Sequence, residues 1–150
     1  MKNSEVIDVL NDLITKNYDA EEGYKEVAEM TDDASLKAFF MSRSQQRYDF
    51  GHELKAEIKR LGGEVDKGTS LLADMHRAWI SLKDAFTSND AEGALEEAVR
   101  GEENALKYYD EAIDKLSGFE HAFAAVSSQR AKVATALADV KVRQKMYEAV

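Results

Sequence analysis

Apolar side chains recur along this chain at alternating spacings of three and four residues, the pattern of an α-helix that buries one face. Four segments show it: residues 4–30, 33–61, 90–116 and 119–148. The first stripe is Val6, Leu10, Leu13, Asn17, Ala20, Tyr24 and Val27, and the second is Leu36, Phe39, Phe40, Arg43, Arg47, Phe50, Leu54, Ile58 and Leu61. The third is Ala91, Leu95, Ala98, Glu102, Leu106, Tyr109, Ile113 and Leu116, and the fourth is Phe119, Phe123, Val126, Arg130, Val133, Leu137, Val140, Gln144 and Tyr147. The sequence therefore predicts four helices, each about 40 Å long at about 1.5 Å per residue.

The predicted helix ends carry residues that commonly begin or stop a helix. Side chains that can accept a hydrogen bond from the first turn favour the start, and glycine favours the end. Candidate N-caps are Ser4, Asp32 or Asp33, and Asn89 or Asp90, and candidate stops are Gly62-Gly63 and Gly118.

The connection between the second and third helices is too long for a tight turn. Residues 62–89 contain an amphipathic piece of their own, residues 70–86, with Trp79 as its expected anchor against the bundle. A helix there could run the length of the bundle, so the third helix would start at the opposite end and lie parallel to the second. We therefore predict one all-α domain over residues 1–150, a ferritin-like four-helix bundle with a helical crossover.

Composition and charge narrow the class further. Charged residues make up 33% and apolar residues 44% of the 150 residues, which is typical of a globular protein. The absence of Cys excludes disulfides, thiolate metal sites and Cys nucleophiles. A net charge of −9 argues against nucleic acid as a partner, and the charges within residues 1–12 favour a helix over a signal peptide. No apolar run is long enough to cross a membrane, so we expect a cytoplasmic protein.

Several short motifs resemble a known family. They are His76-Arg77-Ala78-Trp79-Ile80-Ser81-Leu82-Lys83, Arg100-Gly101-Glu102 followed by Tyr109, Glu22-Gly23-Tyr24, and Arg60-Leu61-Gly62-Gly63. With them the chain, over roughly residues 4–145, resembles the bacterial ferritin-like four-helix-bundle proteins classed as a domain of unknown function. The resemblance implies the fold but no activity. The family often has a His near the position of Leu137, which this sequence lacks.

Ferritin-like folds suggest a dimetal-carboxylate site. Such a site takes one inward Glu from each of two helices and an inward Glu-x-x-His from each of the other two. Glu21 falls inside the apolar arc of its helix, and Glu102 falls at the centre of its own. These two residues are the candidate metal ligands, and iron or manganese would be the ion.

The other half of that site is missing from the sequence. Asp49 and His52 have the required spacing but fall on the outward face of their helix, and the last helix has no Glu-x-x-His. The inward mid-helix positions hold Arg43 and Arg47 instead. We therefore expect the two arginines to pair with Glu21 and Glu102 and to depress the pKa of both carboxyl groups. This charge network is favoured over a metal site, and we predict no catalytic or cofactor-binding residue.

The histidines offer little further chemistry. His52 and His121 fall on outward faces and are expected to be ordinary surface residues, whereas His76 beside Trp79 is expected to border a packing seam. The favoured function is therefore a non-catalytic bundle that acts by binding a protein partner or by self-association, with a link to stress among its expected roles. The alternatives are a metal-binding oxidoreductase or storage protein that uses Glu21 and Glu102, and a bundle that binds a small apolar ligand.

Overall fold

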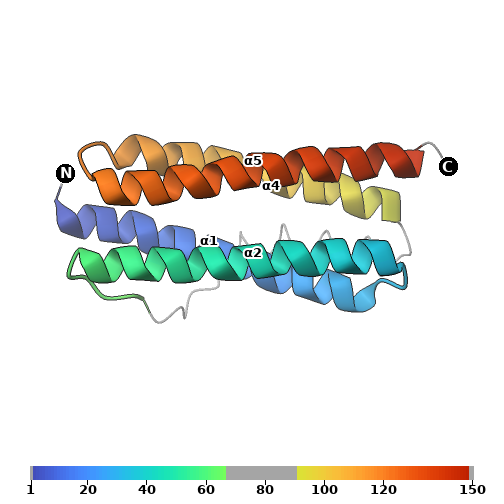
Figure 1. Ribbon diagram of the computed structural model, residues 1–150, viewed down its shortest axis with the longest axis horizontal. Coiled ribbons are helices and arrows are strands. Elements are labelled where there is room, and N and C mark those ends of the chain that lie inside the picture. Colours follow the sequence, from blue (N-terminus) through green and yellow to red (C-terminus); the bar gives the residue numbers. More distant parts are fainter. Residues whose placement is uncertain (1, 67–90, 149–150) are drawn as a thin grey trace.

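A computed structural model describes residues 2–66 and 91–148 of the protein. The elements there are α1 (Asn3–Met30), α2 (Ala34–Arg60), α4 (Ala91–Lys115) and α5 (Glu120–Glu148), with no strand in these two ranges (Figure 1). The predicted all-α class and the four long helices are confirmed, each to within a few residues of its expected ends. The predicted crossover helix over residues 70–86, with His76 and Trp79, lies outside the described residues.

The described helices form two antiparallel hairpins, α1 with α2 and α4 with α5 (Figure 1). The hairpins meet where α2 contacts α5 and where α1 contacts α4, so α2 and α4 lie across the bundle from each other. Because α2 ends at the opposite end of the bundle from the start of α4, these two helices run in the same direction (Figure 1). Within the two ranges, no helix combines the length and the apolar composition of a membrane span.

The starts of the helices only partly follow the expected caps. Helix α1 begins one residue earlier than predicted, so Ser4 lies in its first turn and is not the N-cap; Lys2 precedes the helix without a side-chain cap. The expectation for α2 holds, because Asp33 Oδ1 accepts hydrogen bonds from the backbone N–H groups of Ser35 (2.9 Å) and Leu36 (3.1 Å). These bonds satisfy amide groups that a helix start leaves unpaired.

Both predicted glycine stops lie at helix ends. Gly62 has φ +75° and Gly118 has φ +89°, in the left-handed region that a side chain disfavours. At the end of α2 the N–H of Gly63 donates to the carbonyl of Ile58 and that of Gly62 to the carbonyl of Lys59, each at 3.0 Å. This pair of bonds closes the last turn and redirects the chain away from the helix axis.

The apolar core consists of two clusters placed one after the other along the bundle. The cluster nearer the start of α1 contains Val6, Leu10, Leu13, Ile14, Phe50, Leu54, Ile58, Ala105, Tyr108, Tyr109, Ala112, Leu116, Ala122, Val126 and Val133. The cluster nearer the end of α1 contains Ala20, Tyr24, Val27, Ala28, Leu36, Phe39, Phe40, Ala94, Leu95, Ala98 and Val140. All seven residues of the predicted α1 stripe are buried.

The predicted stripe of α5 is wrong at Phe123. Its side chain is 43% exposed, and Ala122, one residue earlier, takes the buried position. Arg130, also in that stripe, is half-buried and pairs with Asp110, whose Oδ1 lies 2.9 Å from its Nε. The spacing misled because α5 carries small uncharged residues on more than one face, so two stripes fit its sequence almost equally well.

Candidate functional site

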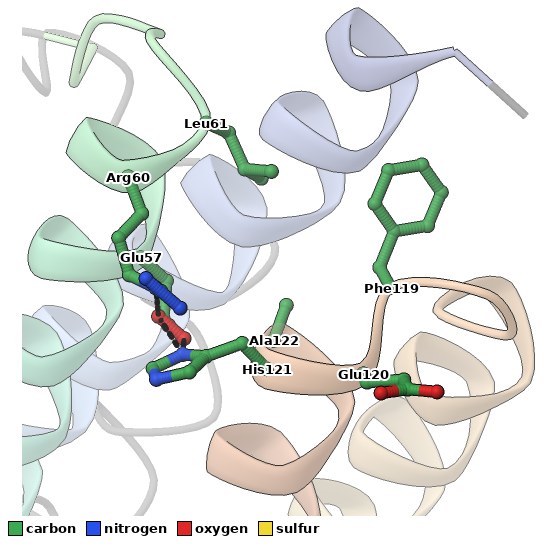
Figure 2. A pocket seen from close by; sticks show the side chains of 7 residues that line it. All are labelled: Glu57, Arg60, Leu61, Phe119, Glu120, His121 and Ala122. Atoms are coloured by element: carbon green, nitrogen blue, oxygen red, sulfur yellow. Dashed lines mark hydrogen bonds and ion pairs between the residues drawn. The ribbon is translucent and has the colours of Figure 1, made fainter.

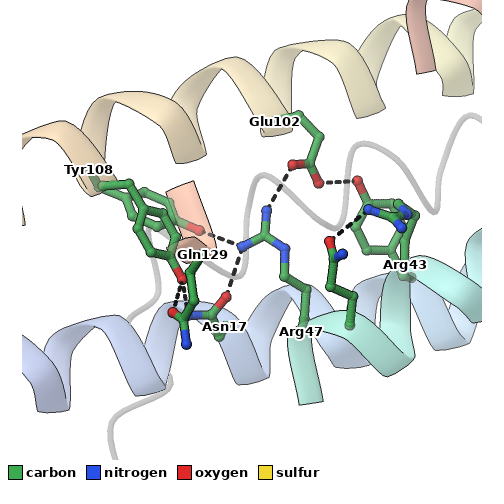
Figure 3. A network of polar contacts seen from close by, with 9 residues as sticks. Asn17, Arg43, Arg47, Glu102, Tyr108 and Gln129 are labelled. Atoms are coloured by element: carbon green, nitrogen blue, oxygen red, sulfur yellow. Dashed lines mark hydrogen bonds and ion pairs between the residues drawn. The ribbon is translucent and has the colours of Figure 1, made fainter. Parts of the chain in front are cut away.

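A layer of polar side chains crosses the middle of the bundle between the two apolar clusters (Figure 3). All four described helices contribute to it, and its members are Asn17, Tyr24, Arg47, Glu102, Tyr108, Tyr109 and Gln129. Every one of them is buried. Buried polar groups are costly unless they find partners, so the layer can be judged by its hydrogen bonds.

An ion pair between Arg47 and Glu102 forms the centre of the layer. Arg47 Nη2 lies 2.9 Å from Glu102 Oε2, and the two residues are 2% and 0% exposed. The Tyr24 hydroxyl donates to the other oxygen, Oε1, at 2.5 Å. Arg47 Nη1 donates to Asn17 Oδ1 at 2.9 Å and to the Tyr108 hydroxyl at 3.0 Å. Both carboxylate oxygens and both terminal guanidinium nitrogens are therefore engaged.

From Asn17 the layer continues across the bundle to α5. Asn17 Nδ2 donates to the Tyr109 hydroxyl at 2.9 Å, and that hydroxyl donates to Gln129 Oε1 at 2.7 Å. Gln129 Nε2 in turn donates to the backbone carbonyl of Phe50 at 3.2 Å and to Glu53 Oε1 at 3.0 Å. One connected set of hydrogen bonds thus links four helices.

The electrostatics of the layer keep Arg47 charged and the tyrosines protonated. Burial alone would lower the pKa of the Arg47 guanidinium, but the Glu102 carboxylate and the nearby tyrosines raise it well above its usual value. Burial, and then the charge of Glu102, raises the pKa of Tyr24 well above its usual value. The pKa of Tyr109 is also raised, mainly by burial. The tyrosines therefore remain hydrogen-bond donors at physiological pH.

The structure brings Arg47 and Glu102 together but places Glu21 elsewhere. Along the axis Glu21 lies level with Ser44, next to Arg43, since the Ser44 hydroxyl donates to the Glu21 backbone carbonyl at 2.9 Å. Its half-buried side chain, however, lies at the outer seam of α1 and α2, where the charges of Lys25 on α1 and Lys55 on α2 act on it. Burial, and then the charge of Glu22, raises its pKa. The expected depression of the Glu21 pKa by arginine is wrong. The apolar arc of α1 is narrower than predicted, so the Glu21 side chain lies outside the core and away from the arginines.

Arg43 does not contact Glu21 in the described part of the chain. Its Nη1 donates to Gln46 Oε1 at 2.7 Å, and its guanidinium carbon lies 5.9 Å from the centre of the Phe39 ring. Its Nε is buried and has no hydrogen-bond partner among residues 2–66 and 91–148. Of the four residues considered as candidate ligands or their partners, only Arg47 and Glu102 form the predicted ion pair.

A second polar cluster, at the end of the bundle, was not predicted from the sequence. His121 is exposed, as predicted, but its Nδ1 lies 2.8 Å from Oε2 of the buried Glu57 and also contacts Oε1. Arg60 Nε lies 3.5 Å from the same carboxylate. Figure 2 shows these groups beside an open cavity of about 280 Å³, which Leu61 and Phe119 also line. The sequence did contain one indication of this cluster. Glu57 directly precedes Ile58 at the edge of the apolar stripe, where a carboxylate can be buried.

His52 and Asp49 are both exposed, as predicted. The His52 ring packs edge-on against Tyr48, with 4.4 Å between ring centres. This arrangement gives the Asp49-x-x-His52 pattern no place in the core.

The central layer does not fit a dimetal centre. Both oxygens of Glu102 are already engaged, by Arg47 and by Tyr24. Within residues 2–66 and 91–148, no three His, Cys, Asp or Glu side chains come close enough together to hold a metal ion. The guanidinium of Arg47 contributes a positive charge where the ions would have to lie.

The family described as "Domain of unknown function (DUF2383)" matches residues 5–115 of the chain. The chain belongs to this family. The match covers most of α1 and all of α2 and α4, and with them Arg47 and Glu102, but not α5 with Gln129. No curated protein matches the chain. Family membership therefore agrees with the resemblance to a domain of unknown function and brings no activity with it.

Replacing Glu21 with Gln is expected to stabilise the protein slightly at neutral pH. A carboxyl group whose pKa is higher in the folded state opposes folding once it ionises. The gain should be absent below the unfolded value of about 4.3 and should grow as pH rises through the raised folded value. Urea unfolding at acidic and neutral pH measures it, with the exposed Glu29→Gln as the control on the same helix. A loss of stability at neutral pH would contradict the placement of Glu21.

Proposed function

We propose that this protein is a non-catalytic ferritin-like bundle in which the polar layer around Arg47 and Glu102 takes the place of a dimetal centre. Its role would then be exerted through its surface, by self-association or by binding a protein partner. The ferritin-like assignment is supported by the shared direction of α2 and α4, because a connection between the far ends of parallel helices is typical of that fold.

The Arg47–Glu102 ion pair is the observation that carries the proposal. Ferritin-type chemistry needs carboxylates and imidazoles that leave coordination positions open for oxygen. Here the one buried carboxylate of the layer is neutralised by a guanidinium at 2.9 Å and also accepts a tyrosine hydroxyl. A layer whose polar groups hydrogen-bond to one another stabilises the fold and leaves no free group for catalysis.

The nature of the partner follows from charge. A net charge of −9 opposes contact with the phosphates of nucleic acid, so a protein surface is the better candidate. A cytoplasmic location, a bacterial source and a link to stress stay predictions from the sequence.

The alternative of a small apolar ligand finds little support in the described residues. The cavity beside Glu57 is lined by the charged residues Glu57, Arg60 and Glu120 and by the polar His121, as well as by apolar groups. A second cavity, of about 220 Å³, lies between α1 and α4 and is lined mostly by charged side chains, namely Asp8, Asp12, Lys16, Glu111 and Lys115. Apolar ligands favour pockets with mainly hydrophobic walls.

Metal analysis tests the proposal. The protein is produced with iron or manganese supplied and purified without chelator, and the metal is then quantified by mass spectrometry alongside a Glu102→Gln variant. We expect both proteins to carry well below one ion per chain and neither to accelerate oxygen consumption by ferrous iron. Stoichiometric metal in the native protein that is lost in the variant would overturn the proposal and establish a ferritin-type site at Glu102.

A further inference from the structure

The outward face of α5 carries almost no charge along its whole length. Residues at alternating spacings of four and three, with a final step of four, form a continuous line on that face, and all of them are exposed. They are Ala124, Ser128, Ala131, Thr135, Ala138, Val142 and Met146, which together we term the α5 outer face. Val142 is 58% and Met146 61% exposed, the two highest values among the exposed large apolar side chains of the described residues.

Helix α4 shows what a solvent-facing helix of this protein otherwise looks like. Its exposed positions are mostly charged, and include Glu92, Glu96, Arg100, Glu103, Lys107, Asp110, Glu111, Asp114 and Lys115. A helix that faces water normally carries such residues, whereas one that is uncharged on opposite faces is usually covered on both. The inner face of α5 is covered by the core. Its outer face is exposed, and no residue within 2–66 and 91–148 covers it.

We propose that the α5 outer face packs antiparallel against the same face of a second copy of this chain. The spacing of four and three residues is that of helices that pair along their length. When two copies of α5 are aligned antiparallel about residue 133, Ala124 faces Val142 of the second copy, and Ser128 faces its Ala138. Val142 thus meets one of the smallest side chains of the face, and Ala131 and Thr135 pair at its centre, in a two-fold contact of the kind most dimers use.

The charges at the ends of the line are complementary in the same alignment. Glu120 comes opposite Met146 and within one residue, about 1.5 Å along the axis, of Lys145 of the second copy, so the carboxylate can reach that amino group. The two-fold axis repeats the pair at the other end. Both residues are exposed in the single chain. A parallel alignment would instead place Glu120 beside Glu120 and Lys145 beside Lys145, and like charges repel. The charge pattern therefore favours the antiparallel pairing.

The size of this face suits a dimer. Residues 120–146 span about 40 Å of helix. Contact along that length by both copies would place the interface among the smaller specific ones, at about 1,000–1,200 Å² in total. This inference rests on the proposed function, because it names a second copy as the partner through which a non-catalytic bundle would act.

The oligomeric state of the full chain tests the inference. Light scattering coupled to size exclusion should give a dimer for the native protein and a monomer for Ala131→Glu, since that change buries a charge in the centre of the contact. Both proteins should unfold at the same urea concentration once dissociated by dilution, because Ala131 is exposed in the single chain. The control is Asn104→Glu, which adds the same charge at an exposed position of α4 and should stay dimeric.

Cross-linking tests the direction of the pairing on a chain with no native Cys. A mixture of Ser128→Cys and Ala138→Cys chains should form a disulfide between unlike chains, whereas either variant alone should not, since like positions would be about 15 Å apart along the axis. Linkage of each variant to itself would overturn the antiparallel arrangement. A dimer that survives Ala131→Glu would overturn the α5 outer face as its interface. If the native protein is monomeric at all concentrations and free of metal, the inference is overturned and the proposed function requires a different partner. If the protein instead carries stoichiometric metal, the proposed function itself is overturned.

Discussion

Replacing Arg47 with Met is expected to lower the free energy of unfolding by about 3–5 kcal/mol, the usual cost of removing one member of a buried ion pair. The apolar side chain fills much of the same volume, so the loss comes from what it leaves behind. The Glu102 carboxylate would stay fully buried with only the Tyr24 hydroxyl as its partner. Urea unfolding followed by circular dichroism measures the change.

A double variant separates a stranded charge from lost packing. Adding Glu102→Gln to Arg47→Met removes the buried charge while the amide oxygen can still accept the Tyr24 hydrogen bond. We expect the double variant to recover most of the stability that Arg47→Met loses, because replacing both partners of a buried pair is often close to neutral. If the two substitutions simply added their costs, the ion pair would not be the reason for the loss.

Replacing Phe50 with Ala is expected to cost about 3–5 kcal/mol as well, as large-to-small changes in a core do. Phe50 is 1% exposed, and its ring meets Tyr109 edge-on with 6.4 Å between centres. Its loss opens a cavity next to the polar layer, since Gln129 Nε2 donates to the backbone carbonyl of this residue. The measurement is the midpoint and slope of urea unfolding.

The control for that change is Met41→Ala on the same helix, where the side chain is 44% exposed. It should leave the unfolding midpoint nearly unchanged, because a solvent-facing side chain leaves no cavity behind. Equal losses for the two variants would mean that α2 does not present Phe50 to the core.

The position of each residue along its helix was predictable from the sequence, because apolar residues recur along α1 at a regular spacing of three and four. Val6 and Val27, at the two ends of the buried stripe, are both fully buried. Along the axis Glu21 lies level with Ser44, and Glu102 lies level with Arg47. Such levels depend only on residue counts and a constant rise, so they survive small errors in helix ends.

Positions around the helix axis were less predictable. Glu21 and Ala20 differ by about 100°, which separates the core from the α1–α2 seam but lies within the width of an apolar arc. The sequence therefore predicted the pairing of Arg47 with Glu102, at the centres of their arcs, and misplaced Glu21 at the edge of its own. The predicted burial of Phe123 was wrong for the same reason, since it lies on a helix whose uncharged residues cover two faces.

For the residues that contact the Arg47–Glu102 pair, the sequence indicated a polar layer but did not identify each member. Asn17 and Gln129 occupy inward positions where an apolar residue would be usual, which indicates a polar layer at that level. Tyr108 gave no such signal, because a tyrosine next to Tyr109 is equally compatible with the core and with a helix edge. Its hydroxyl became part of the layer only through the reach of Arg47 across the bundle.

The position of the polar layer between two apolar clusters fixes the axial register of the helices. A slide of α2 past α4 by one helical turn, about 5.4 Å, would move the Arg47 guanidinium away from Glu102 and into apolar surroundings. The remaining layer groups would lose their donors and acceptors at the same time, so no neighbouring alignment offers comparable stability. The bundle is thus expected to resist shear along its axis, and any change of shape would have to come from the two hairpins moving apart.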